Sequence, residues 1–456
     1  MRRDAEHGIG RRQAAPPSGG PLTLHDSTCS QIIRPMSPPV RFLLFLFFFL
    51  PGLPSLAFAG AMPALDGNAW NIVFVQSLEA DPATNGLSVR GLNHALRLGQ
   101  LLKSVTAGKA GDLRRIYSLD PESNPGDMAS TQSIAPYALL VDLGISHRLV
   151  REGGIDDYDS PAYIVDDILK NRPRGDYFFA MPASMIESAI EAFGGHVKAM
   201  NPGQYLVMSV ENGKTGFALF DDGIKPDDRY PELHLKPASQ CPEKPVSFTV
   251  RRPASSRFEF DSNQTVYFVR HAEAHPNRGF ENGNLVCQGE WRAIGADEVL
   301  FRKTGGKAQN LFSSNPADLI GCDSECSYVR PSLTLSPYAI RHRKTLMLAS
   351  FQWNDAPTLA ASLFTKNTPY SEKAFDHAVT LVSWEHGNIE NAVKYLIGVL
   401  YGNPEAAKKI PEWSFDDYDT IWKLKTDADG NITFSNACEG IESDSLPSTC
   451  PAFPPR

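Results

Sequence analysis

The segment 265–277, "TVYFVRHAEAHPN", is a run of aromatic and β-branched residues that ends on Arg270 and His271. Such a run predicts a strand covered on both faces, with the two basic residues where the strand ends. A second segment, 71–83, "NIVFVQSLEADPA", has the same rhythm but carries Gln76 and Ser77 in those places. One predicted strand end therefore carries basic groups, and its counterpart lacks them.

The two segments open two halves in which the same kinds of element follow one another. Each predicted strand is followed by a helix, a second strand and helix, a later strand and helix, and a terminal hairpin. The hairpin turns contain Asn212-Gly213 in the first half and Asp429-Gly430 in the second. Alternating strands and helices predict an α/β fold in which each half is a mainly parallel sheet flanked by helices.

Composition divides the chain into a leader, two halves and a linker. Residues 66–220 and 263–456 are expected to form two domains. Residues 221–262 are rich in proline and charge and lack an apolar period, so we interpret them as a linker that covers a sheet edge. The net charge of −8, from 44 basic and 52 acidic residues, argues against a broad nucleic-acid-binding surface.

Residues 1–59 are expected to be a leader and signal peptide. Within "RFLLFLFFFLPGLPSLAFAGAM", residues 41–62, Arg41 precedes an apolar run that Pro51-Gly52 breaks, and Ala57-Phe58-Ala59 fits a cleavage site. A membrane anchor is the alternative, although the unbroken run is short for a span, which needs about 20 residues. We expect translation to begin at Met36, a signal at about 36–59, and a secreted or periplasmic protein without a stable membrane span.

The number of cysteines is consistent with an exported protein. Cys29 lies in the expected leader, and the remaining cysteines are Cys241, Cys287, Cys322, Cys326, Cys438 and Cys450. An even number in an exported chain predicts disulfides, whose pairing the sequence leaves open. Cys322 and Cys326 could close a small loop. A zinc site is disfavoured, because no second cysteine pair at ligand spacing and no histidine cluster accompany them.

Basic residues gather at the predicted ends of strands in the second half. Arg270 and His271 end one strand, Glu385-His386-Gly387 ends a later one, and Arg330 follows a loop after a third. Ligands of open parallel sheets bind beyond these carboxyl ends. Two guanidiniums can hold a phosphoryl group by forked hydrogen bonds, and a neutral imidazole can attack its phosphorus. The pattern therefore predicts phosphoryl transfer, which needs positioning and charge neutralisation.

Roughly residues 262–435 resemble the histidine phosphatase superfamily, also called phosphoglycerate-mutase-like. The family opens with Arg-His-Gly-Glu, and this chain has Arg270-His271-Ala272-Glu273. Asn277 matches an asparagine seven residues after the family's arginine, Arg330 matches its helix-start arginine, and His386-Gly387 matches its late His-Gly pair. The resemblance implies two tandem three-layer α/β/α domains, each with a mainly parallel central sheet.

The resemblance also implies roles for individual residues. His271 would be the nucleophile that becomes phosphohistidine, and Arg270, Arg330 and His386 would form the phosphate pocket. Asn277 and Glu385 would help to bind the substrate, and no metal or other cofactor is implied. The family's proton donor is a carboxylic acid, for which Glu385, Asp355 and Glu281 are candidates. Arg341 and Arg343 are alternatives to Arg330, and His275 fits no motif and is expected at the surface.

The first half departs from this pattern at four matching places. Gln76, Ser77, Ala129 and Ala183 stand where Arg270, His271, Arg330 and His386 stand in the second half. Without cations and a nucleophile, phosphoryl transfer has no means there. The sequence thus predicts an exported phosphomonoesterase with a single site, acting on a small phosphorylated substrate. The alternative is a non-catalytic protein that binds phosphate esters or a partner.

Overall fold

The computed structural model describes residues 65–453 apart from 107–112, 122–126, 151–157, 198, 234, 236–237, 239–240, 242–243, 276–281, 322–325 and 367–372. The expected leader and signal peptide, with Asn277, Glu281 and Cys322, lie outside the described residues. Among the helices that are described, none combines the length and the apolar character needed to cross a membrane.

The first sheet has six strands in the order β3-β2-β4-β1-β5-β6. Its four strands β1–β4 pair in parallel, and the β5–β6 hairpin joins them in antiparallel fashion beside β1. Asn212 and Gly213 both have positive φ, as the predicted two-residue turn requires. The strands are β1 (Trp70–Gln76), β2 (Leu113–Leu119), β3 (Ile145–Leu149), β4 (Gly175–Met181), β5 (Gln204–Glu211) and β6 (Lys214–Asp221).

The second sheet repeats this order and adds a strand at its edge: β12-β9-β13-β8-β14-β15-β7. Pairing is parallel from β12 to β8 and antiparallel from β8 to β7. The prediction of a mixed α/β fold with parallel central strands is therefore confirmed. The strands are β7 (Ser247–Val250), β8 (Thr265–Arg270), β9 (Asn310–Ser313), β12 (Leu346–Leu348), β13 (Val379–Trp384), β14 (Thr420–Thr426) and β15 (Ile432–Cys438).

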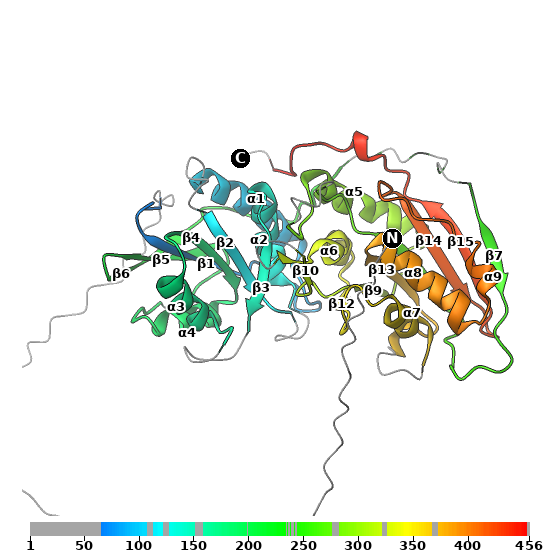
Figure 1. The fold of residues 1–456 in the computed structure, drawn as a ribbon. Helices are drawn as coiled ribbons and strands as arrows, with labels where there is room; N and C mark the ends of the chain where they lie inside the picture. The colour runs from blue at the N-terminus through cyan, green and yellow to red at the C-terminus, as the bar shows by residue number, and fades with distance from the viewer. Residues whose placement is uncertain are drawn as a thin grey trace, which may run out of the picture. The chain divides into compact units, whose positions relative to one another are not determined.

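Helices cover both faces of each sheet (Figure 1). In the first half, Val73 and Val75 pack with α1 and α2, whereas Ile72 and Phe74 pack with α3 and α4 on the opposite face. This alternation follows from the two-residue period of a strand. The helices are α1 (Val89–Thr106), α2 (Ala129–Leu140), α3 (Pro161–Asn171) and α4 (Ala183–Glu191).

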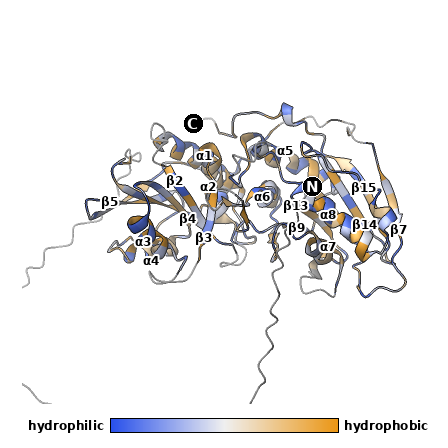
Figure 2. Cartoon of the chain, in the orientation of Figure 1, coloured by the Kyte–Doolittle hydropathy of each residue, from blue (hydrophilic) through white to orange (hydrophobic). Residues whose placement is uncertain are grey.

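The second half has the same three layers. Val269 packs in the core that contains residues of α5 and α6, and Phe268 packs in the core of α7 and α8. The helices carry both orange and blue segments in Figure 2, as expected of helices with one buried and one solvent face. The remaining elements are α5 (Cys287–Lys303), β10 (Leu319–Ile320), β11 (Cys326–Ser327), α6 (Arg330–His342), α7 (Ala356–Phe364), η2 (Lys373–Phe375), α8 (His386–Tyr395), η3 (Leu396–Leu400), α9 (Pro404–Ala407) and η4 (Ser443–Ser445).

The two halves share packing within residues 56–456, which form one compact unit. A single apolar core contains Leu96 and Tyr137 of the first half together with Leu333 of the second. Inside it, Gln132 Nε2 donates a buried hydrogen bond of 2.9 Å to Ser336 Oγ. Because such a buried polar pair costs free energy when it is broken, the halves are expected to depend on each other for stability.

Part of the predicted linker belongs to the second sheet. Strand β7 lies within residues 221–262 and pairs with β15 at the sheet edge. A disulfide between Cys241 and Cys438 joins the same segment to the end of β15, and a second disulfide joins Cys287 to Cys450. Cys326 is also disulfide-bonded. The prediction that the cysteines form disulfides is confirmed for these five.

We expect His94 to make stability depend on pH in the alkaline range. Its buried ring lies between Glu79 Oε2 at 2.9 Å and Asp222 Oδ2 at 2.7 Å. Burial alone would lower the pKa of His94, but the two carboxylates raise it to about 9. Because the pKa of His94 is higher in the folded state, the protonated ring stabilises the fold. This stabilisation is fully present below about pH 6.5 and is lost as the pH rises through about 9.

Denaturant unfolding at several pH values checks the pH dependence expected from His94. The native protein should lose stability on the order of 2 kcal/mol between pH 7 and pH 10 relative to the His94→Gln variant. The exposed His377 provides a matched control, and His377→Gln should keep the native pH dependence. Parallel curves for the native protein and His94→Gln would contradict the assignment.

Candidate active site

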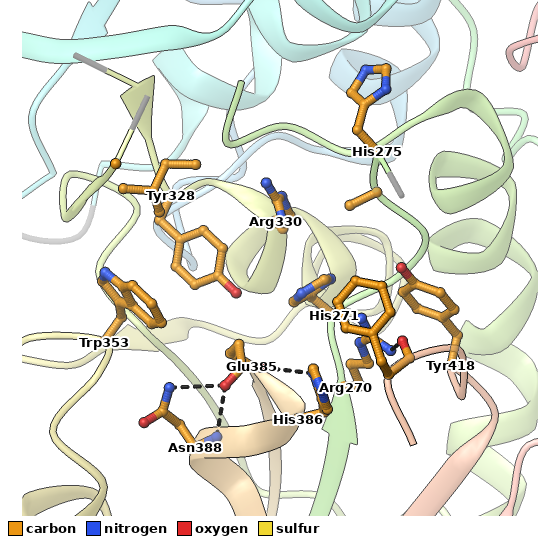
Figure 3. A pocket seen from close by; sticks show the side chains of 14 residues that line it. Arg270, His271, His275, Tyr328, Arg330, Trp353, Glu385, His386, Asn388 and Tyr418 are labelled. Carbon is orange, nitrogen blue, oxygen red and sulfur yellow. Dashed lines mark hydrogen bonds and ion pairs between the residues drawn. The ribbon is translucent and has the colours of Figure 1, made fainter. Parts of the chain in front are cut away.

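A cavity of about 560 Å³ lies beyond the carboxyl ends of β8 and β13. Arg270, His271, Arg330, Glu385 and His386 all line it (Figure 3). These are five of the six site residues predicted from the sequence, and the sixth, Asn277, lies outside the described residues. The structure thus brings the predicted side chains together, and their catalytic roles stay predictions.

Strand pairing explains why these residues meet. β8 and β13 pair in parallel with Arg270 opposite Trp384, so both strands end at the same edge of the sheet. His271 follows directly after β8, and Glu385 and His386 follow directly after β13. Arg330 is the first residue of α6. Arg341 and Arg343, the sequence alternatives, instead pair with Asp297 and Asp81.

The His271 ring has the tautomer that a nucleophile needs. Its Nδ1 lies 2.8 Å from the carbonyl oxygen of Ala272 and donates a hydrogen bond to it. The lone pair is then on Nε2. Burial lowers the pKa of His271 well below its ordinary value, and the charges of Arg270 and Arg330 lower it further. The imidazole is therefore neutral and able to attack an electrophile in the cavity.

The two arginines offer N–H groups to this cavity. Arg270 Nη1 donates to the carbonyl oxygens of Phe415 and Asp417, and its guanidinium carbon lies 3.9 Å from the centre of the Tyr418 ring. No described residue accepts a hydrogen bond from Arg270 Nε, or from Nε and Nη2 of Arg330, although these atoms are buried. Buried donors without acceptors are costly, so the arrangement favours an anion in the cavity.

Glu385 lies against the first turn of α8 and beside His386. Its carboxylate caps α8 by accepting from the N–H groups of Gly387 and Asn388, and Oε1 lies 2.7 Å from His386 Nδ1. Burial alone would raise the pKa of Glu385, but the contact with His386 and the two N–H groups lower it to about 2. His386 itself starts α8, where the helix N-terminus favours a bound anion.

Neither of the other two candidate proton donors is among the described residues that line the cavity. Asp355 caps α7 through hydrogen bonds with Thr358 and is not among the residues that line the cavity. Glu281 lies outside the described residues. Among the described residues that line the cavity, Glu385 is the one carboxylic acid, and it is ionised.

Sequence patterns did not reveal several lining residues. Tyr328, Trp353, Phe415 and Tyr418 line the cavity but lie on irregular segments without an apolar period. His275, expected at the surface, lines it too. Its position only four residues after His271 in the sequence could have indicated that it lies at the site.

A turn of the first half contacts His275, which lines this cavity. Asp142, between α2 and β3, accepts from Asn282 Nδ2 at 2.9 Å and lies 2.6 Å from His275 Nε2. In the sequence, His275 and Asn282 flank positions 276–281. Beside them, the Gly283 carbonyl accepts from the backbone N–H of Arg330 at 3.2 Å. Gly283 has a φ of +76°, and a Cβ there would lie 1.9 Å from the Ser327 carbonyl oxygen.

Members of the histidine phosphatase superfamily are among the solved structures that this chain resembles. One is a protein from Agrobacterium tumefaciens described as a phosphohistidine phosphatase, with 15% identity and a TM-score of 0.24 over 36% of this chain and 91% of that one. Another is a mycobacterial glucosyl-3-phosphoglycerate phosphatase in complex with inorganic phosphate, with 15% identity and a TM-score of 0.25 over 39% of this chain and 100% of that one.

A third is a phosphoserine phosphatase mutant from Entamoeba histolytica in complex with phosphoserine, with 10% identity and a TM-score of 0.22 over 37% of this chain and 94% of that one. No protein-family model and no curated protein matches the sequence. These likenesses are weak and cover about a third of the chain, so the function is inferred below from the side chains around the cavity.

We expect Asp142→Gly to weaken phosphate binding while leaving the fold intact. The variant removes the carboxylate that contacts His275, a lining residue of the cavity, and Asn282. Contacting residues couple by about 1 kcal/mol, so the affinity for inorganic phosphate should fall about fivefold by calorimetry. The Asp142 side chain is largely exposed and glycine accepts its φ of +55°, so the unfolding temperature should stay close to native. Glu298→Ala removes a comparable exposed ion pair with Arg302 and should leave both quantities unchanged. Unchanged affinity in Asp142→Gly would contradict this role.

Proposed function

We propose that this protein is a histidine phosphatase that hydrolyses phosphomonoesters through a phosphohistidine at His271. The observation that carries the proposal is the neutral His271 ring, with Nδ1 engaged by the Ala272 carbonyl, in a cavity with arginine N–H groups that lack partners among the described residues. These groups supply a nucleophile and an anion pocket, the two requirements of the reaction.

The reaction has two displacements. His271 Nε2 attacks phosphorus, a P–N bond forms, and the bond from phosphorus to the ester oxygen breaks. The alcohol oxygen leaves with the electron pair and takes a proton from solvent, since the lining carboxylate Glu385 is ionised. Water then attacks the phosphohistidine and forms a P–O bond while its proton passes to solvent, the P–N bond breaks with its electron pair returning to Nε2, and inorganic phosphate leaves. Arg270, Arg330 and His386 hold the phosphoryl oxygens through both steps.

Export and metal independence are part of the proposal. The disulfides Cys241–Cys438 and Cys287–Cys450 suit an oxidising compartment, which supports secretion or a periplasmic location after cleavage of a signal at about 36–59. The two arginines supply the positive charge that a metal ion supplies in other phosphoryl-transfer enzymes. We therefore expect no metal requirement.

We further propose that residues 66–220 are an inactive tandem copy of residues 263–456. The two sheets have the same strand order. Ala129 is the first residue of α2 as Arg330 is of α6, and Ala183 is the first residue of α4 as His386 is of α8. The backbone N–H of Ser77 bonds to the Met181 carbonyl, as that of His271 bonds to the Trp384 carbonyl.

The electrostatics of the corresponding cavity support inactivity. A cavity of about 500 Å³ lies at the ends of β1 and β4 and is lined by Gln76 and Ser77. The charged side chains among its described lining residues are Glu79, Asp81 and Asp127. Glu79 and Asp81 already engage His94 and Arg343. None of the described lining residues is an arginine or a lysine, so a phosphate dianion would lose its hydration there without gaining a cationic partner.

Phosphate release from 4-nitrophenyl phosphate between pH 4 and 8, without added metal, tests the proposed function. We expect turnover that falls about 10³-fold or more in His271→Ala, because the covalent route is lost. His377→Ala, which alters an exposed histidine remote from the cavity, is the matched control.

Equal turnover in His271→Ala and the native protein would rule out the proposed mechanism. A folded protein without turnover at any pH, but with saturable binding of inorganic phosphate, would instead support the alternative of a non-catalytic binding protein.

A further inference from the structure

Aromatic side chains form much of the wall of the second-half cavity. Tyr328 and Trp353 lie on one side of it and Tyr418 lies on the other, with His271 and Arg330 between them (Figure 3). Phe415 completes the set. None of the four belongs to a helix or strand, so they come from the loops that surround the strand ends. Loops in this position commonly determine what a site accepts.

Three of these aromatic rings lie against the arginines, and the Phe415 ring centre is 5.4 Å from the Arg270 guanidinium carbon. The Tyr418 ring centre lies 3.9 Å from the Arg270 guanidinium carbon, and the Tyr328 ring centre lies 5.5 Å from that of Arg330. Cation–π contacts of this kind hold the guanidiniums in place. Tyr328 and Tyr418 therefore belong to the floor that holds the phosphoryl group.

Trp353 and Phe415 also present apolar surface to a ligand. Phe415 is 47% exposed although it lines a cavity, and Trp353 is partly exposed with its Nε1 bonded to the Leu319 carbonyl. Leu319 itself is 57% exposed, and its neighbour Ile320 lines the cavity. Exposed large apolar side chains gathered at a site mark a surface that a ligand covers.

The fixed charges limit how much phosphate the cavity can hold. Its described lining residues include two arginines, Arg270 and Arg330, opposed by the ionised Glu385, while His271 is neutral. This balance suits one phosphoryl group. Among the described lining residues, a second phosphate would meet apolar walls and no further arginine or lysine, and burial of its charge without partners is costly.

We propose that the substrates of this site are monophosphate esters whose alcohol part carries a flat aromatic ring. The ring would stack on Trp353 and Phe415 while the single phosphoryl group contacts the two arginines. An aromatic pair contributes about 0.5–1.5 kcal/mol beyond the burial of its area, so the ring adds to affinity. This inference rests on the proposed phosphatase function.

Substrates with matched leaving groups test the ring preference. 2-Phenylethyl phosphate, 2-cyclohexylethyl phosphate and propyl phosphate all release primary alkyl alcohols, so their intrinsic reactivities are similar and the attached group differs. We expect kcat/KM to be about five- to tenfold higher for the phenyl ester than for the cyclohexyl ester, with the propyl ester lowest. Equal values for the phenyl and cyclohexyl esters would overturn the proposal.

Two variants assign the preference to the named rings. Trp353→Leu and Phe415→Leu should each reduce the phenyl-over-cyclohexyl ratio at least about threefold. Phe415 is exposed, so its replacement leaves the fold intact even if Trp353→Leu does not fold. Tyr158→Leu alters an aromatic ring that is 69% exposed and lies outside the cavity, and it should leave the ratio unchanged. A native ratio in Phe415→Leu and Trp353→Leu would contradict the assignment.

A binding measurement separates this inference from the proposed function. Phenylphosphonate and cyclohexylphosphonate are not hydrolysed, and their affinities for the native protein can be compared by calorimetry. Tighter binding of phenylphosphonate in a protein without turnover would support the ring site while refuting the phosphatase. Turnover without any ring preference would refute the ring site and keep the phosphatase. The affinities of free phosphotyrosine and of a phosphotyrosine peptide for the His271→Ala variant, which lacks the covalent route, then distinguish small-molecule from peptide sources.

Discussion

The backbone hydrogen bond from His271 N–H to the Trp384 carbonyl, 2.9 Å long, continues the parallel pairing of β8 with β13 to the edge of the second sheet. The site depends on this pairing, because it sets His271 beside Glu385 and His386. Successive side chains of a strand point to opposite faces, so a register slip of one residue would turn Arg270 away from the cavity. The apolar residues of both strands, buried between helices on either face, fix that register.

The two halves share a strand order but differ in the charge of the residues at the strand ends. The first sheet has the same strand order and the bond from Ser77 N–H to the Met181 carbonyl. Its fold needs the buried strands and helices, and none of that packing requires cations at the strand ends. The two halves also share a core, and Asp142 of the first half contacts His275 beside the cavity of the second. The first half thus contacts a lining residue of the second-half cavity. Its own cavity is lined by carboxylates.

Sequence patterns predicted the features that follow from short-range regularity. Apolar runs and turn residues located the strands, and the predicted ends of β8 and β13 pointed to Arg270, His271, Glu385 and His386, which line one cavity. Strand β7 was not predicted, because four residues in a proline-rich segment carry no period and are ordered through pairing with β15. The aromatic wall of Trp353 and Phe415 and the contact of Asp142 were missed for a related reason. They depend on contacts between segments far apart in the chain, which periodicity does not encode.

The measurement that tests the central claim most directly is the capture of the covalent intermediate. The native protein would be mixed rapidly with excess 4-nitrophenyl phosphate, quenched in alkali, digested, and analysed by mass spectrometry. The structure predicts one added phosphoryl group on His271, stable in alkali and lost in acid, and absent from His271→Ala. Phosphate release in the first turnover without a phosphoryl group on His271, or with one on another residue, would contradict the account.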